Sequence, residues 1–125
     1  TINRARLSDE AVGKELADRR SLRARIFYPY LKMVRIRKRQ PAFHPSAGMQ
    51  ILNLDDRVFA VKRFCPKQTL YAVSNFSADP LTVALPVRKD STPICDLLSG
   101  ERFGAGSIPL SAYQTVWLTR NASND

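Results

Sequence analysis

Acidic side chains are the first candidates for chemistry, because pairs of carboxylates serve many enzymes as general acid and general base. One group of four lies in a stretch with a helical pattern: Asp9, Glu10, Glu15 and Asp18. A second group lies mostly in turns or at strand ends: Asp55, Asp56, Asp79 and Asp96. Neither group has the setting of a catalytic pair, so we predict that no carboxylate of this chain is catalytic.

Histidine and cysteine give little support for a metal or nucleophilic site. His44 is the only histidine, and its neighbours Phe43, Pro41 and Pro45 cannot assist catalysis or metal binding, so we expect a structural hydrogen-bonding role. Cys65 and Cys95 lie far apart without a CxxC pattern. We predict buried free thiols, no metal and no cofactor.

Positive charge is concentrated at the start of the chain. The formal net charge is +9, and residues 1–47 hold twelve Lys and Arg against four Asp and Glu. A compact cluster of Arg35, Arg37, Lys38 and Arg39 could neutralise phosphates, which leaves a basic nucleic-acid-binding module as an alternative. We favour a solvated helix end, where the macrodipole stabilises cations, and therefore expect no nucleic-acid partner.

The segment before Gln40 has the signals of two helices. Ser8 is an N-cap followed by acidic residues, and Ser21 is a second N-cap. From there an apolar stripe recurs at helical spacing to about Gln40: Leu22, Ile26, Tyr30, Met33 and Val34. Pro29 interrupts this pattern and predicts a kink or a later helix start.

After Gln40 the pattern changes to that of a β-domain. The Pro41–Pro45 segment predicts a rigid extended connector, so we place a boundary between a helical region, 1–47, and a β-domain, 48–125. Short runs rich in β-branched and aromatic residues follow: Met49–Leu54, Arg57–Phe64, Gln68–Asn75, Leu81–Leu85 and Gln114–Thr119. Turn residues at 55–56, 77–80 and 99–101 separate strands, which indicates an antiparallel sheet or sandwich.

Aromatic side chains raise the alternative of an independent carbohydrate-binding module. Trp117 and Tyr113 could stack on a sugar, and this reading requires exposed rings at Tyr71, Tyr113 or Trp117. Trp117 lies within an apolar run, so we predict core packing for it.

Size and hydropathy narrow the class of protein further. A chain of 125 residues is too short for a (β/α)₈ barrel, which needs roughly 250 residues. No stretch approaches the roughly 20 apolar residues of a membrane span, and the first residues lack the apolar core of a signal peptide. We expect a cytoplasmic protein without a membrane partner.

Several short strings, in order, resemble one family along nearly the whole chain. The first half carries Ile2-Asn3-Arg4, Ser21–Arg25 and Ile36–Pro45. The second half carries Asp55–Ala60, Val73–Ser77, Asp96–Gly100 and Tyr113–Leu118. Together they are similar to the carboxy-terminal part of sucrose phosphorylase-like members of the α-amylase superfamily, glycoside hydrolase family 13.

The resemblance implies a mainly β fold: an antiparallel α-amylase C-terminal domain preceded by one or two helices left from the barrel. It further implies retaining glucosyl transfer, with the catalytic carboxylates upstream. Arg4, in the Ile-Asn-Arg string, would hold hydroxyls of the glucosyl ring. Thr1 stands where sucrose phosphorylases usually have aspartate, so a related glucoside phosphorylase with another acceptor stays open, as does a glycosidase.

The partners that the resemblance implies are the rest of the catalytic barrel and, through it, the sugar substrate and phosphate. The apolar stripe around Leu22, Ile26 and Tyr30 would then lack part of its native partner. An exposed stripe of this kind favours self-association of the chain through that helix face.

Overall fold

The computed structural model describes residues 8–88, 92–104 and 106–120. Two compact units divide the chain, residues 1–35 and residues 36–125, and each is described by itself. Within the described ranges, neither helix is long and apolar enough to cross a membrane.

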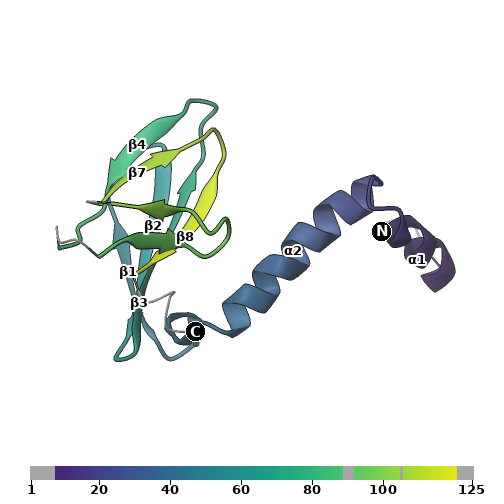
Figure 1. Ribbon diagram of the computed structural model, residues 1–125, viewed down its shortest axis with the longest axis horizontal. Helices are drawn as coiled ribbons and strands as arrows, with labels where there is room; N and C mark the ends of the chain where they lie inside the picture. Colours follow the sequence, from purple (N-terminus) through teal and green to yellow (C-terminus); the bar gives the residue numbers. More distant parts are fainter. Residues whose placement is uncertain (1–7, 89–91, 105, 121–125) are drawn as a thin grey trace, which may run out of the picture. The chain divides into compact units, whose positions relative to one another are not determined.

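The first unit is a pair of helices, α1 (Asp9–Ala17) and most of α2 (Leu22–Lys38), shown in Figure 1. Both predicted N-caps are confirmed. The Ser8 hydroxyl accepts from the Ala11 amide at 3.1 Å, and the Ser21 hydroxyl accepts from the Ala24 amide at 3.1 Å. Ser21 also donates to the Glu15 carbonyl at 2.6 Å, so one side chain starts α2 and closes the end of α1.

Pro29 lies inside α2 without delaying its start. The helix begins at Leu22 and includes Pro29, so a later start is wrong. Proline removes one backbone donor, but residues on both sides continue the helix and the Ser21 cap fixes its first turn. Leu22, Ile26 and Tyr30 of the predicted stripe are exposed.

The second unit opens with a tight turn where we expected an extended connector. Pro41–Phe43 form a short 3₁₀ helix, η1, with proline in its first turn, where its missing N–H costs nothing. Gln68 holds this turn from the sheet: its side-chain oxygen accepts from the Ala42 amide at 3.0 Å, and its side-chain nitrogen donates to Gln40 at 2.8 Å. Tertiary hydrogen bonds therefore favour the turn over the extended form.

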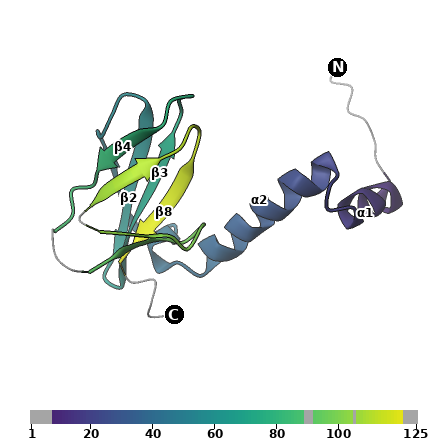
Figure 2. The ribbon, with the colours of Figure 1, turned by 45° about the horizontal axis from the view of Figure 1, so that its top comes forward.

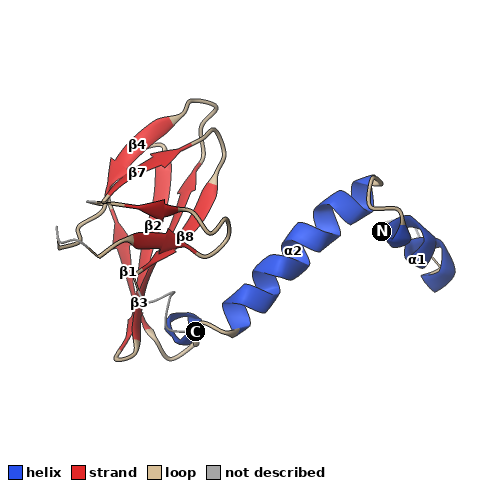
Figure 3. Ribbon diagram, in the orientation of Figure 1, coloured by secondary structure: helices blue, strands red, loops and turns tan. Residues whose placement is uncertain are grey.

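The rest of the second unit is antiparallel β-structure, as predicted (Figure 3). Its strands are β1 (Gly48–Leu52), β2 (Val58–Cys65), β3 (Gln68–Asn75), β4 (Leu81–Ala84), β5 (Ile94–Asp96), β6 (Arg102–Phe103), β7 (Ser107–Leu110) and β8 (Thr115–Thr119). One sheet has the order β1-β2-β3-β8-β5-β6, and a second pairs β4 with β7. The sequence pattern indicated β1, β2, β3, β4 and β8 and missed β5, β6 and β7, of which β5 and β6 are too short for a clear alternation.

A hydrophobic core fills the space between these two sheets, as the views of β4 and β7 against the large sheet show (Figures 1 and 2). Its buried members are Ala60, Tyr71, Val73, Val83, Leu85, Ile94, Ile108, Leu110, Val116 and Leu118. Within the large sheet they are cross-strand neighbours on one face: Ala60 pairs with Val73, which pairs with Val116. The predicted sandwich is confirmed.

Asp96 joins the end of β5 to the central strand β8. This side chain is only 1% exposed, and its carboxylate accepts from the Leu98 amide at 3.1 Å, the Ser99 hydroxyl at 2.7 Å and the Trp117 amide at 2.9 Å. The Ser99 amide is a fourth donor at 3.2 Å. The turn it holds ends at Gly100, whose φ of +81° suits glycine and confirms the predicted turn.

We expect Asp96→Asn to destabilise the 125-residue chain by about 2–4 kcal/mol, because the amide group would turn a donor toward backbone donors inside the protein. Urea denaturation followed by tryptophan fluorescence measures this loss. Asp79→Asn, which makes the same change on an exposed side chain, should stay within about 0.5 kcal/mol of the parent chain. Equal stability of the two variants would contradict the role of Asp96.

Candidate functional site

The outer face of the large sheet, opposite the core, carries large apolar side chains and is our first candidate for a functional surface. The strand register pairs Met49 with Arg63, Ile51 with Val61, and Val61 in turn with Ala72. Trp117 continues this row on β8. One end of the face is covered by η1, and the other end is open.

At the covered end Trp117 packs into the unit. The Phe43 ring of η1 meets the Trp117 ring edge-on, with centroids 5.0 Å apart. Trp117 is 8% exposed and Tyr71 is likewise buried, so the core packing predicted for Trp117 is confirmed. Tyr113, in a turn, is 68% exposed, so one of the three positions named for a sugar-stacking surface does carry an exposed ring.

At the open end three large apolar side chains face solvent. Met49 is 62% exposed, Ile51 63% and Phe59 52%. Ile51 and Phe59 are diagonal neighbours across β1 and β2, because Ile51 pairs with Val61 two residues from Phe59. We call these three residues the β1–β2 patch. Contiguous exposed apolar surface of this kind marks a site of protein contact.

The β1–β2 patch was not predicted from the sequence. Alternation along 58–63 indicated two faces with different environments. It did not show that both faces carry large apolar side chains, one covered by a second sheet and one partly bare. The sequence feature that could have indicated the patch is Phe59, a large apolar residue on the strand face opposite Val58 and Ala60.

The residues considered as candidates for chemistry come from several parts of the chain. Arg4 lies outside the described residues. The acids of α1 and the turn after it lie near basic side chains at the surface, as in Glu15 with Arg23 at 2.9 Å and Glu10 with Lys14 at 3.7 Å. Such exposed pairs contribute little stability and form no pocket.

His44 and the cysteines have structural surroundings. The His44 Nδ1 atom lies 2.7 Å from the Ser46 hydroxyl and 3.1 Å from the Ser46 amide, which confirms its local hydrogen-bonding role. Both cysteines are free, as predicted, but they are half-buried, so the expectation of burial was too strong. Within the described ranges, no group of three or more His, Cys, Asp or Glu could hold a metal ion.

The basic cluster at the end of α2 is mostly solvent-exposed. In the second unit Arg37 lies over the Phe43 ring, with its guanidinium carbon 5.3 Å from the ring centroid. Arg37, Lys38 and Arg39 are exposed. Part of this charge therefore supports η1 packing through a cation–π contact.

Asp55 and Arg57 form the best-defined ion pair of the second unit. The Arg57 guanidinium donates to both Asp55 oxygens at 3.0 Å, and the Arg57 amide donates at 2.9 Å. These hydrogen bonds, with the side-chain bond the larger influence, lower the pKa of Asp55 from 3.8 to about 2. The pair closes the turn into β2.

The sequence is similar to those of two carbohydrate-active enzymes. No family model matches the chain. It is 34% identical over 136 residues to glucosylglycerate phosphorylase of Spirochaeta thermophila, a match that covers 95% of this chain and 23% of that protein. It is 36% identical over 61 residues to palatinase of Erwinia rhapontici, covering 49% of this chain and 11% of that protein.

Solved structures agree on the fold. Trehalulose synthase MutB of Pseudomonas mesoacidophila superposes with a TM-score of 0.63 at 24% identity, over 86% of this chain and 19% of that chain. AmyP, solved with maltotriose, superposes with a TM-score of 0.61 at 20% identity, over 70% of this chain and 19% of that one. This β-sandwich is thus of the α-amylase C-terminal type.

The chain is similar to enzymes of the α-amylase superfamily, glycoside hydrolase family 13. It spans less than a quarter of the length of the curated relatives it matches.

We expect the Asp55 carboxyl to titrate near pH 2 in the folded chain, which NMR of the side-chain carboxyl measures directly. Because its folded pKa lies below the ordinary value, the pair stabilises the fold above about pH 4 and this contribution is lost as the pH falls through about 2. Asp55→Asn should therefore lose less stability than the parent chain between these values. An Asp55 midpoint near 3.8 would contradict the pairing.

Proposed function

We propose that this chain is the non-catalytic carboxy-terminal part of a cytoplasmic carbohydrate-active enzyme, a retaining glucoside phosphorylase of the α-amylase family. The observation that carries the proposal is the similarity along 95% of the chain to less than a quarter of a glucosylglycerate phosphorylase. The helical region, 1–47, would be the end of the catalytic barrel, and residues 48–125 its accessory β-domain.

The chemistry follows from that parent. A carboxylate of the barrel attacks the anomeric carbon and forms a covalent glucosyl-enzyme, while a second carboxylic acid protonates the leaving group. Phosphate then attacks to give glucose 1-phosphate, or water attacks in a glycosidase. We expect the acids of this chain to take no part. Among the described residues, Glu10 and Glu15 lie in exposed ion pairs, and Asp96 holds backbone amides.

Arg4 is the one residue that we assign to the substrate. Its guanidinium, with several fixed donors, suits hydroxyls of a glucosyl ring or a carboxylate that orients them. The donor would be a glucoside of glycerate or of a related acceptor, in agreement with the name of the relative and with Thr1 at the start of the string. The two free cysteines suit the reducing cytoplasm.

We propose the catalytic barrel as the partner of the two exposed apolar surfaces. One is the β1–β2 patch and the other is the stripe of Leu22, Ile26 and Tyr30 on α2. The parent chain supplies several hundred residues that could cover them, as the share of the relatives outside the match indicates. In the isolated chain the α2 stripe would pair with a second copy.

The decisive assay uses the full-length parent enzyme. We expect phosphate-dependent release of glucose 1-phosphate from glucosylglycerate or another α-glucoside of a panel that includes sucrose and isomaltulose, with Arg4→Lys raising KM. Incubation without phosphate is the control. Release of glucose only, independent of phosphate, would contradict the phosphorylase and indicate a glycosidase.

The β1–β2 patch gives a second prediction. Ile51→Ser and Phe59→Ser should leave the stability of the 125-residue chain within about 0.5 kcal/mol, because both side chains are exposed there. In the full-length parent each should cost about 1–3 kcal/mol, since the buried apolar contact is lost. Thermal denaturation of both proteins measures this difference. Phe76→Ser, at a 68% exposed turn position, is the matched control, and equal effects of all three variants in the parent would refute docking through the patch.

A further inference from the structure

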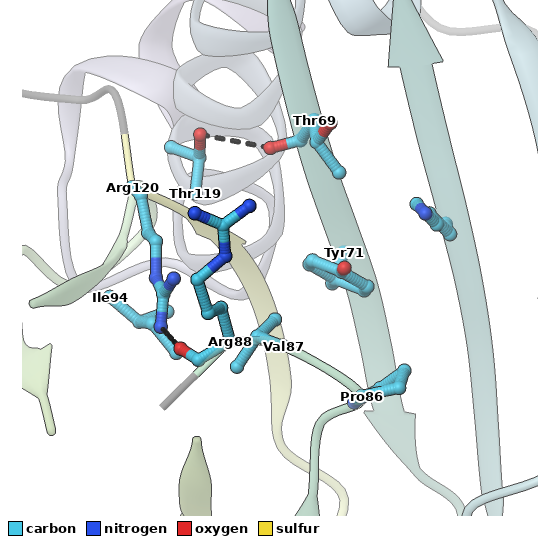
Figure 4. A pocket seen from close by; sticks show the side chains of 9 residues that line it. Thr69, Tyr71, Pro86, Val87, Arg88, Ile94, Thr119 and Arg120 are labelled. Carbon is cyan, nitrogen blue, oxygen red and sulfur yellow. Dashed lines mark hydrogen bonds between the residues drawn. The ribbon is translucent and has the colours of Figure 1, made fainter. Parts of the chain in front are cut away.

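A basic pocket opens at one end of the sandwich interior, away from the β1–β2 patch on the opposite face of the sheet. Its volume is about 470 Å³, within the range of small-molecule sites. Three cationic side chains line it together with a tyrosine: Lys62, Arg88, Arg120 and Tyr71. Figure 4 labels Arg88, Arg120 and Tyr71 among them.

The strand register brings these residues together from distant parts of the sequence. Lys62 and Tyr71 are direct partners across β2 and β3, on the core side of the sheet. Arg120 follows the end of β8, and Arg88 follows β4. The Arg120 guanidinium donates to the Arg88 carbonyl. This hydrogen bond holds the segment that follows β4 close to the end of β8.

The charge of this pocket is one-sided. Among the described residues that line it, two carry a guanidinium, one carries an ammonium and none is acidic. Like charges held together at a protein surface repel each other, and an anion between them removes this cost. Burial raises the pKa of the Tyr71 hydroxyl, against the opposing influence of Arg120, so this hydroxyl keeps its proton and can donate to an anion.

We propose that this pocket binds a phosphate group, either as inorganic phosphate or as a small phosphate monoester. A phosphate monoester carries about −1.5 to −2 charges at neutral pH, which matches three cations better than the single charge of a carboxylate does. Its oxygens accept from the fork of an arginine and from a hydroxyl at the same time. The proposal is drawn from charge and geometry within the β-domain and does not rest on the reaction of the parent enzyme.

Binding is tested on the 125-residue chain by calorimetry at fixed ionic strength. Inorganic phosphate and glucose 1-phosphate are the probes, and acetate and a short single-stranded oligonucleotide are the comparison anions. We expect saturable binding of at least one phosphate probe, with Arg88→Gln and Lys62→Gln each weakening it about tenfold through loss of a charge-assisted hydrogen bond. Arg102→Gln makes the same charge change on an exposed strand residue outside the pocket and should bind as the parent chain does.

The outcomes separate the sources of phosphate. Equal affinity for the two probes identifies the phosphate group as the whole ligand, and tighter binding of glucose 1-phosphate identifies a monoester whose sugar also contacts the pocket. Acetate binding as tightly as phosphate, or an equal loss in Arg102→Gln, would overturn the proposal in favour of a general charge effect. Tighter, Arg88-dependent binding of the oligonucleotide would overturn it in favour of a nucleic-acid surface. Thermal melting of each variant checks that the fold is kept.

Discussion

The buried carboxylate of Asp96 is the interaction on which the arrangement of the large sheet depends. β5 is three residues long, too short to hold its place by ladder hydrogen bonds alone, yet it connects β8 to the sheet edge. The carboxylate offers four acceptor positions and finds four donors, from Leu98, the Ser99 amide and hydroxyl, and Trp117. A charge can remain inside a protein only when its hydrogen bonds are satisfied to this degree. The 97–101 turn and β8 are therefore fixed together.

From β8 the constraint passes to both faces of the sheet. Val116 and Leu118 point into the core between the sheets, while Trp117 points outward against Phe43. The same strand thus supports the sandwich interior and the turn η1, which Gln68 holds from β3. The β1 end of the outer face has no comparable cover, and Met49, Ile51 and Phe59 face solvent there. This exposed apolar surface is the basis of the docking that we propose for the domain.

Basic residues serve different purposes in different parts of the chain. Near the end of α2 they are exposed, and Arg37 stabilises the aromatic turn beside it. Arg57 closes a turn with Asp55. Lys62, Arg88 and Arg120 instead line one pocket. Most of the net positive charge lies in the helical region. The pocket lined by three cationic side chains nevertheless lies in the β-domain, whose charge is nearly balanced.

Local signals in the sequence determined the helices and their caps, five of the strands, the turns between them and, through short strings in order, a resemblance to one family. These features depend on neighbours in the chain: Ser8 and Ser21 cap the residues that directly follow them, and alternation along 58–65 and 68–75 reports a pleated strand. Only the tertiary structure decided the 3₁₀ turn at Pro41–Phe43, the strands β5, β6 and β7, the patch on β1 and β2, and the pocket lined by Lys62, Arg88 and Arg120. Each of these depends on contacts between residues far apart in sequence, such as Gln68 with Ala42 or Asp96 with Trp117, and no local pattern specifies such contacts.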